Sequence, residues 1–292
     1  PAPEGQGVWP HIPLRLDVPN SVDAKVRIRS NQLLLGRTKI QDVSATVVLE
    51  EGTARVKPFK FQFLGGIVGG GIRLKPLGKG VALASAFRVE GLDVGAAAEK
   101  LQLKHPLTGK AHVEADLGTH GRSFAELIER LERNITISVR DGTVAHDYLE
   151  SIDMDLAARA AFSLLDFLNR GTSAVQVDCF AGRFQVRDGI ARSTLLAFDT
   201  PNMRVVGEGT TNLGSGALAF SFQPDFKDTG SLNALIQAGL SLTEPAMQFK
   251  LVGTLEKPKL VMDPGRTLTA MVESLGNGAS QVPRGNWCSV LR

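Results

Sequence analysis

Residues 175–226 restrict the possible folds more than any other part of this 292-residue chain. Short runs in which apolar and polar residues alternate are separated there by turn residues, namely Asp188-Gly189, Thr200-Pro201-Asn202 and Gly214-Ser215-Gly216. A period of two, broken by such turns, is typical of antiparallel strands that follow one another in a sheet. The stretch therefore predicts a β-meander.

The composition agrees with a turn-rich β protein that has a sizeable core. The chain has 31 Gly and 14 Pro, only one Tyr, and 43% hydrophobic residues. Its 33 basic and 30 acidic residues nearly balance, with a net charge of +3, and no run of five like charges occurs. A nucleic-acid-binding surface is therefore not indicated, although a preference for anionic lipid headgroups stays open.

The first third of the chain predicts a second meander. Alternating runs of strand type occupy residues 22–29, 32–35, 42–49, 53–63, 72–74 and 81–89, and Glu51-Gly52 is the clearest hairpin turn. In residues 59–63 three phenylalanines fall on one face, which must meet apolar material. The glycines of residues 65–71 lack the ending of a phosphate-binding loop, so they predict a bulge or a close backbone approach.

The two meanders resemble repeats of one unit. Residues 49–55 align with residues 186–192, and residues 68–71 align with residues 206–209. Two copies of such a unit imply an elongated sheet that grows by addition of strands.

Helical patterns and further strands lie between and after the meanders. Helices are predicted over residues 93–103, from the capping box at Ser123 through Leu131, and over residues 147–169, 231–237 and 268–275. The helix over 147–169 is expected to pack on one side or end of the sheet, or to act as a lid or membrane-interface contact. Further strands are predicted over residues 111–117, 134–139 (closed by Asp141-Gly142), 247–255 and 259–262.

The predicted fold class is mainly β: an elongated, strongly bent antiparallel sheet, forming a groove or a partly open barrel, with a few amphipathic helices. Residues 1–13 are expected to be a linker, with Trp9 against the first strand. Residues 14–121 form the first repeat, and residues 122–265 form a helical segment with the second repeat. Residues 266–292 are a C-terminal helix and a flexible tail.

No catalytic or metal-binding pattern stands out. His112, Glu114 and Asp116 share one face of a predicted strand, but residues two apart lie about 7 Å apart, which is wide for three ligands of one ion. A solvated face explains them better. Nucleophile elbows, zinc-binding helices, calcium-binding loops and CxxC pairs do not occur in the sequence. We expect no enzyme activity, no cofactor and no metal.

The two cysteines exclude a framework of disulfides but leave one bridge open. Cys179 is predicted to be a buried small hydrophobic residue, while Cys288 lies in the tail. No run approaches the roughly 18 to 20 apolar residues of a transmembrane helix. Since the chain begins at Pro1 without Met, we expect it to be the C-terminal portion of a longer protein.

Several short runs resemble, in their order and spacing, the C-terminal region of the AsmA family of bacterial envelope proteins. They are Cys179 to Arg192, Phe198-Asp199-Thr200-Pro201, Val206-Gly207-Glu208-Gly209 and the strand end from Val252 to Pro258. The resemblance covers roughly Leu14 to Pro264.

AsmA-like proteins are similar in outline to bridge-like lipid transfer proteins, whose sheets fold into an elongated groove. The resemblance implies a periplasmic protein that shields phospholipid acyl chains and supports outer-membrane biogenesis. It implies tethering to the inner membrane by a segment absent from this chain. The expected partners are phospholipid or another lipid, the membrane and envelope proteins, but not nucleic acid.

The candidate groove residues are apolar side chains of the predicted strands: Phe59, Phe61, Phe63, Leu196, Phe198, Phe220, Phe222, Ile135 and Ile137. Ordinary core packing explains each of them as well as lipid contact does. The alternative function is therefore a non-enzymatic assembly or scaffold module, whose core is sealed and whose edge strands dock protein partners.

Overall fold

A computed structural model describes residues 9–14, 23–35, 38–100, 107–145, 153–155, 159, 174–201, 203–227 and 248–262. These residues form a 14-stranded sheet in which the strands follow one another in chain order, except that β8 lies at the far edge beside β14. The pairs are antiparallel apart from β14 and β8, which are parallel. The predicted long antiparallel sheet is confirmed.

The strands are long for a globular protein. The first four, which we call the first wall, are β1 (Ala24–Leu35), β2 (Thr38–Glu50), β3 (Thr53–Phe63) and β4 (Gly66–Leu77). The middle strands are β5 (Gly80–Asp93), β6 (Lys110–Gly121) and β7 (Glu132–Ala145). The second wall comprises β9 (Ala174–Arg187), β10 (Ile190–Asp199), β11 (Met203–Asn212) and β12 (Ala217–Phe226). The last strands are β13 (Phe249–Thr254), β14 (Pro258–Met262) and β8 (Asp153–Met154).

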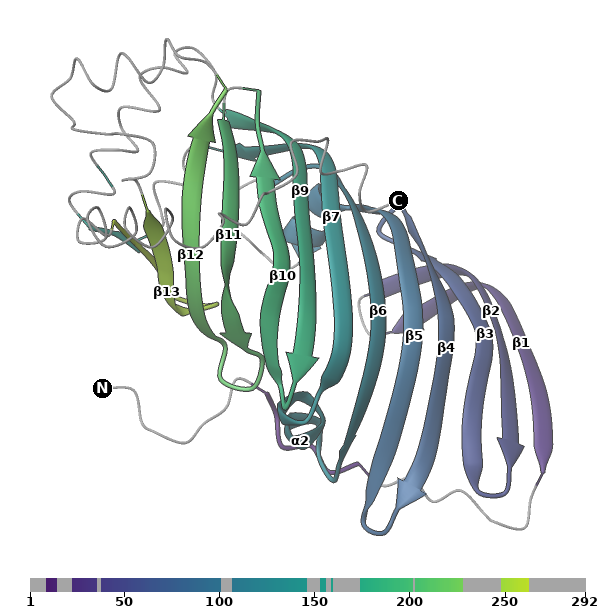
Figure 1. The fold of residues 1–292 in the computed structure, drawn as a ribbon. Coiled ribbons are helices and arrows are strands. Elements are labelled where there is room, and N and C mark those ends of the chain that lie inside the picture. The colour runs from purple at the N-terminus through teal and green to yellow at the C-terminus, as the bar shows by residue number, and fades with distance from the viewer. Residues whose placement is uncertain are drawn as a thin grey trace, which may run out of the picture.

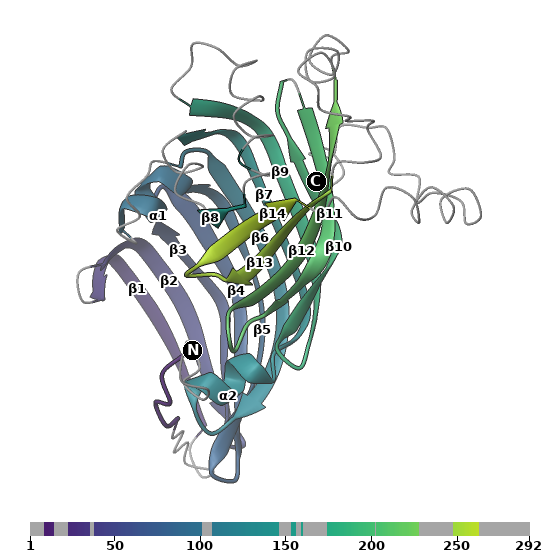
Figure 2. The same cartoon turned by 90° about the vertical axis from the view of Figure 1, so that its left-hand side faces the viewer.

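The sheet bends into a trough and does not close. In Figure 1 the strands run side by side from β1 to β12, and Figure 2 shows them curving so that β13 and β14 come forward of the middle strands. Within the described ranges no ladder joins the two edge strands, β1 and β8. Of the two predicted forms, a groove or a partly open barrel, the structure adopts the bent open groove.

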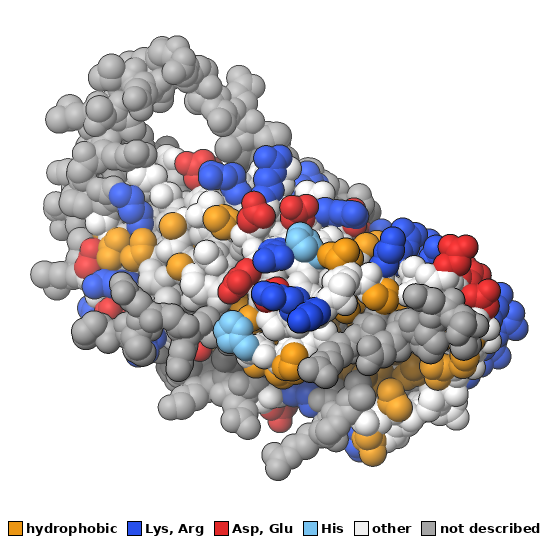
Figure 3. Space-filling model, turned by 90° about the horizontal axis from the view of Figure 1, so that it is seen from below, with side chains coloured by type: hydrophobic (Ala, Val, Ile, Leu, Met, Phe, Trp, Pro, Cys, Tyr) orange, Lys and Arg blue, Asp and Glu red, His pale blue; other side chains and the backbone are white. Residues whose placement is uncertain are grey.

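Strand pairing divides the side chains between two faces, because directly paired residues of antiparallel strands lie on the same face. We call the face that carries Phe59, Phe61 and Phe63 the inner face, and the opposite one the outer face. Viewed from below, charged side chains line the upper and right-hand rim, whereas hydrophobic side chains gather at the lower right (Figure 3).

Glycines allow β4 to approach β5 closely. A Cβ atom at Gly66 would lie 2.7 Å from the Leu92 nitrogen, and one at Gly70 would lie 2.3 Å from the Ala86 oxygen. Any larger residue there would collide with backbone, so the predicted close approach is confirmed. The strand is longer than predicted, however, because Leu64 and Gly65 form the turn and residues 66–71 belong to β4.

One cluster of buried residues lies at the lower end of the inner face, beside helix α2 (Phe124–Glu129), and a second, of Cys179 and Ala181, lies on the opposite face of β9. Leu131, Val186 and Ala191 are buried, and Val186 is only 1% exposed. The predicted cap is present, since the Ser123 hydroxyl accepts a hydrogen bond from the Glu126 nitrogen at 3.3 Å. The helix ends before Leu131, which belongs to the core and not to the helix.

The N-terminal segment adds to this lower end. The Trp9 indole donates a hydrogen bond to the Leu213 carbonyl, and its ring meets Phe124 edge-on at 5.7 Å. Pro13 pairs with Ser123 in an isolated bridge. The prediction that Trp9 packs on the first strand was therefore wrong, because the β11–β12 turn and α2 offer it both an acceptor and an aromatic ring.

Some predicted boundaries were also wrong. The two predicted strands 22–29 and 32–35 are one strand, β1. Asp141-Gly142 does not end a strand: Asp141 adopts φ 51° and the ladder continues to Ala145 opposite Ala174, because β9 runs alongside. Helix α1 (Val94–Lys100) occupies part of the predicted helix 93–103.

The helix predicted over residues 147–169 is contradicted at Asp153 and Met154 but is present at Arg159, whose nitrogen donates a hydrogen bond to the Asp155 carbonyl at 2.9 Å. Asp153 and Met154 pair with Lys259 and Leu260 as strand β8, so a tertiary ladder outweighs the local helical pattern. Residues 147–152, 156–158 and 160–169 of that helix, and the helices predicted over 231–237 and 268–275, lie outside the described residues.

Cys179 is buried as predicted, at 5% exposed, but it is not a free thiol. It takes part in a disulfide, so the single bridge that the sequence left open is the correct alternative. Cys288, the second cysteine of the sequence, lies outside the described residues.

Candidate functional site: a continuous apolar face

Apolar residues form unbroken rows across the inner face. One row passes through Phe61 and crosses from β3 to β10 by direct pairing: Phe61, Val68, Val89, Val113, Ile137, Gly182 and Leu196. With strands about 4.8 Å apart, this row is roughly 30 Å wide. It contains no charged or polar side chain.

A second row passes through Phe59 and reaches the edge strand β1. Its members are Ile28, Ala45, Phe59, Gly70, Phe87, Ala115, Ile135 and Phe184. Ile28 remains 45% exposed, although Val68 and Ala115 further along these rows are buried. The apolar face therefore extends to the rim of the sheet at β1.

The structure brings all nine predicted groove residues to this one face. Phe198 pairs with Val205, and Phe220 and Phe222 pair with Gly209 and Gly207 of the same strand. The sequence left the face of Phe220 and Phe222 open, and the register decides it. Leu196 and Phe220 are buried, and the other seven are half-buried. Their contact with lipid stays a prediction.

Neighbouring phenylalanine rings stack on each other in a similar way in the two walls. The rings of Phe59 and Phe61 stack at 6.0 Å, and those of Phe220 and Phe222 stack at 6.1 Å. In the second wall the rings lie over glycines: a Cβ atom at Gly207 would be 2.6 Å from Phe222 Cδ1.

Sequence reasoning missed several residues of the face. The middle strands contribute Phe87, Val89 and Val113, and the last strands contribute Phe249, Leu251 and Leu260. The alternation in residues 81–89 and 111–117 was visible, but only pairing with β4 and β7 shows that these strands continue the same rows. Met154 of β8 is buried at the far edge of the sheet.

On the outer face of the middle strands, charged side chains of opposite sign form ion pairs. Arg88 lies 2.7 Å from Glu114, and Arg133 lies 2.7 Å from Asp116. Two hollows of about 410 and 300 Å³ share Arg88, Glu114 and Thr136 in their walls. His112, Glu114 and Asp116 are exposed, as expected of a solvated face. Among the described residues no three potential ligands gather as a metal site.

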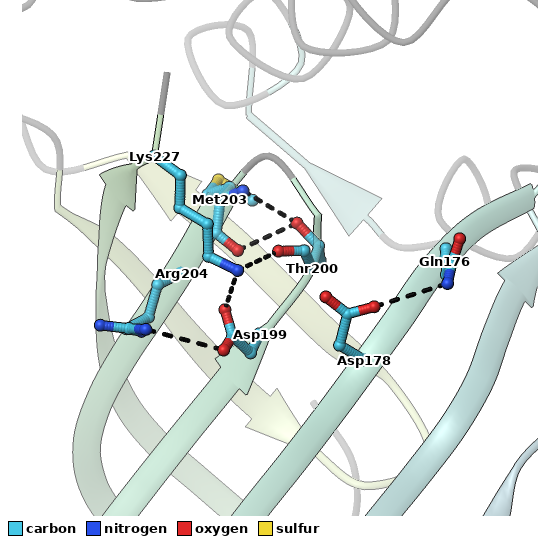
Figure 4. Close-up of polar contacts among 7 residues, drawn as sticks. All are labelled: Gln176, Asp178, Asp199, Thr200, Met203, Arg204 and Lys227. Atoms are coloured by element: carbon cyan, nitrogen blue, oxygen red, sulfur yellow. Dashed lines mark hydrogen bonds and ion pairs between the residues drawn. The ribbon is translucent and has the colours of Figure 1, made fainter. Parts of the chain in front are cut away.

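A polar cluster joins the upper ends of β10, β11 and β12 (Figure 4). Lys227 Nζ lies 2.6 Å from Asp199 Oδ1 and donates to the Thr200 carbonyl at 2.6 Å. Arg204 approaches the other Asp199 oxygen at 3.7 Å. The Thr200 hydroxyl and the Met203 backbone exchange hydrogen bonds across the turn. These contacts hold the end of the second wall and do not reach the apolar rows.

Two carboxylates at the ends of the trough have a lowered pKa. A hydrogen bond from the Lys110 side chain, supported by the Ala96 nitrogen, lowers the pKa of Asp93 beside α1. A hydrogen bond from the Arg122 backbone nitrogen lowers the pKa of Glu126 in α2. Both carboxylates hold the short helices in place through these hydrogen bonds.

Neither of the two helices in the described part of the chain has the length and apolar character needed to cross a membrane. The apolar rows form a wide surface that can bind a long apolar ligand without specific polar contacts, and the ion pairs of the middle strands lie on the other face.

Comparison with known proteins identifies the family. The model of the AsmA family matches residues 1–196 of this chain. The chain belongs to the AsmA family. The resemblance drawn from the sequence is confirmed, although the matched region ends inside the second wall and not at its last strands. AsmA proteins are associated with the envelope, and no catalytic activity defines the family.

One curated relative is the AsmA family protein YhjG of Escherichia coli (strain K12), which is 25% identical over 221 residues. The match covers 75% of this chain and 32% of the relative, so the chain spans about a third of that protein's length. No solved structure matches this chain.

Proposed function

We infer that this chain is a lipid-binding and lipid-transfer domain of the bacterial periplasm. Its inner face shields phospholipid acyl chains, while the headgroups remain in water. Such a domain supports biogenesis of the outer membrane. It works without a nucleotide or a metal.

The observation that carries the proposal is the row from Phe61 to Leu196, which crosses seven strands without a polar side chain. A sixteen-carbon chain loses roughly 13 kcal/mol when it leaves a bilayer for water, at about 0.8 kcal/mol per CH₂. A protein that carries it must return nearly all of this free energy. Only a lining about as long as the chain, roughly 20 Å, can do so.

The rim of the face supports the same function. Val26 and Ile28 of β1 lie on the inner face and are 50% and 45% exposed. Side chains of a core are normally covered, whereas these continue the apolar rows up to an uncovered edge. A lipid that enters from the side of β1 would meet apolar surface from its first contact.

Native mass spectrometry of the purified chain, followed by solvent extraction, tests the proposal. We expect phospholipid at a reproducible stoichiometry. Phe61→Glu and Phe198→Glu each place a charge on the inner face and should abolish lipid recovery. Gln62→Glu is the matched control, because Gln62 neighbours Phe61 but lies exposed on the outer face.

Folding is monitored by circular dichroism and thermal unfolding. If both phenylalanine variants unfold, Val26→Asp at the exposed rim provides the test, since it charges the same face without entering the core. Recovery of lipid from folded inner-face variants at the wild-type level would refute the proposal. A chain that carries no lipid and takes up no fluorescent phospholipid would instead support a scaffold that docks partners through its edge strands.

A further inference from the structure

Positive charge is concentrated in the first wall. Residues 23–79 contain eleven Lys and Arg against four Asp and Glu, a net charge of +7 in a chain whose overall charge is +3. The rest of the chain is therefore net acidic. Whole-chain charge conceals this division, so composition alone does not reveal it.

Strand pairing places most of these cations on the outer face. Lys25, Arg55 and Arg73 belong to one row, since Lys25 and Arg55 both pair with Val48, and Arg55 pairs with Arg73. Arg29 and Lys60 both pair with Ser44 in another row. We call the exposed outer-face cations the basic surface: Lys25, Arg27, Arg29, Arg55, Lys57, Lys60, Arg73 and Lys75.

The residues between these cations are short and uncharged. Ser44, Thr46 and Val48 separate β1 from β3, and Gly69 and Gly71 lie beside Lys60 and Lys57. Cations repeat about every 7 Å along a strand and about every 10 Å between β1 and β3, and Arg55 and Arg73 lie on adjacent strands. The basic surface is thus a broad array and not a narrow stripe.

Acidic partners are scarce there, in contrast with the middle strands. Within the described part of the first wall, Arg55 is the one member of the basic surface that forms an ion pair, with Glu50 at 3.1 Å. In β5 to β7, by comparison, Arg88 and Arg133 are each paired with an acidic side chain. The first wall therefore presents uncompensated charge to its surroundings.

We propose that the basic surface docks this protein on an anionic phospholipid bilayer. A bilayer offers a two-dimensional array of negative headgroups, which matches a broad array of cations. Exposed apolar side chains lie within the same wall: Leu33 and Leu34 at the upper end of β1, and Leu77 at the lower end of β4. Basic residues flanked by exposed leucines are typical of surfaces that rest on a membrane interface.

A single-stranded nucleic acid fits this surface less well. Proteins that bind such strands combine cations with aromatic rings on which the bases stack. The aromatic residues of the first wall, Phe59, Phe61 and Phe63, lie on the inner face. The outer face of the described strands β1 to β4 carries none.

Docking does not depend on the proposed lipid-transfer function, and its test is separate. Vesicles of phosphatidylcholine with 30% phosphatidylglycerol are sedimented with the purified chain at low and high salt. We expect binding to the anionic vesicles that falls at least tenfold in high salt, and little binding to pure phosphatidylcholine. Arg27→Gln, Arg29→Gln and Lys60→Gln together should weaken binding by roughly a hundredfold, at about fivefold for each cation.

A matched control changes the same net charge elsewhere. Arg183, Arg187 and Arg192 are exposed on the outer face of the second wall, and their combined change to Gln should leave vesicle binding within about twofold of the wild type. Thermal unfolding shows whether both triple variants remain folded. A third variant, Phe61→Glu, should lose bound lipid but keep vesicle binding.

Equal binding by the two triple variants would overturn the proposal, because the effect would then follow net charge alone. Vesicle binding that does not depend on salt concentration or on anionic lipid would overturn the proposal as well. If the wild-type chain binds an oligonucleotide in a gel-shift assay but does not bind the vesicles, the basic surface would be a nucleic-acid-binding site. Loss of vesicle binding in Phe61→Glu would show that capture of lipid in the trough, and not the basic surface, causes co-sedimentation.

Discussion

The two walls of the trough use the same strand pattern but differ in what covers it. In the first wall Val26 and Ile28 of the inner face are 50% and 45% exposed, and most outer-face cations have no acidic neighbour among the described residues. In the second wall Val186 is 1% exposed and Ala181 is fully buried. There Asp199 is held by both Lys227 and Arg204.

The difference shows that alternation along a strand determines the face on which each side chain lies, but not what packs against that face. Helix α2 and the Trp9 segment pack at the lower end of the second wall, beside the cluster of Leu131, Val186 and Ala191. Within the described residues nothing equivalent lies on the first wall. The described contacts therefore stabilise the second wall, whereas Val26 and Ile28 of the first wall remain exposed.

The largest expected effect comes from introducing a charged residue at one inner-face valine of each wall. Val186→Asp should lower the free energy of unfolding by about 3 to 5 kcal/mol, since it leaves an unpaired charge in the core. Val26→Asp should change it by less than about 0.5 kcal/mol. Urea unfolding followed by circular dichroism measures both. Equal losses would show that the first wall is as well packed as the second.

A smaller effect is expected at two glycines, Gly69 and Gly207, that the predicted repeat aligns. Gly207 lies on the inner face, where a Cβ atom would be 2.6 Å from Phe222 Cδ1 and 3.0 Å from the Ser221 oxygen. Gly207→Ala should therefore cost about 1 to 3 kcal/mol. At Gly69 of the first wall the nearest atom would be the Phe59 oxygen at 3.6 Å, an ordinary contact. Gly69→Ala should be neutral, and a fall in its thermal midpoint as large as that of Gly207→Ala would contradict the comparison.

The cations of the two walls should also differ in their effect on stability. Lys227→Met removes the closer partner of Asp199, which is 16% exposed, and should cost about 1 kcal/mol while Arg204 remains nearby. Arg27→Met, in the first wall, should leave the thermal midpoint unchanged. Destabilisation by Arg27→Met would mean that the basic surface has a structural role.

The smallest effect concerns acid stability at Asp93, between the walls. The pKa of Asp93 is lowered from its ordinary 3.8, with the Lys110 hydrogen bond as the main cause. Because the folded state favours the ionised carboxylate, this contribution is present above the ordinary pKa and disappears as the pH falls through the lowered pKa. Asp93→Asn should thus unfold at a lower temperature than wild type at pH 6, and the gap should close near pH 2.

Glu99→Gln on α1 is the control for Asp93, since its exposed carboxylate forms no ion pair with the described residues. We expect it to match the wild type at every pH. A gap for Asp93→Asn that persists at pH 2 would show that the carboxylate acts through packing and not through its charge.

Much of the sheet follows from local pattern. The strands of residues 175–226 and 53–63 were predicted with nearly correct bounds, because alternation and turn residues such as Asp188-Gly189 act over short distances. The cap of α2 was equally visible, since Ser123 and Glu126 are three residues apart. The nine groove candidates could be chosen for the same reason, as apolar residues on alternating strands.

Other features depend on contacts between distant residues. Met154 lies in a helical pattern but pairs with Leu260, and Trp9 binds near Leu213 instead of the first strand. The basic surface was overlooked because its members are spread over four strands and are brought together by pairing. Residues that are remote in sequence carry no local signal of their final neighbours.

The sequence by itself determined that this chain forms a long antiparallel sheet with one apolar face, because a period of two assigns each side chain to a face before any strand pairs. The tertiary structure alone decided how rows such as that from Phe61 to Leu196 join across seven strands. It also decided where the trough bends, which wall is covered and where the cations gather. Register, curvature and burial arise from contacts between strands, and a pattern within one strand does not contain them.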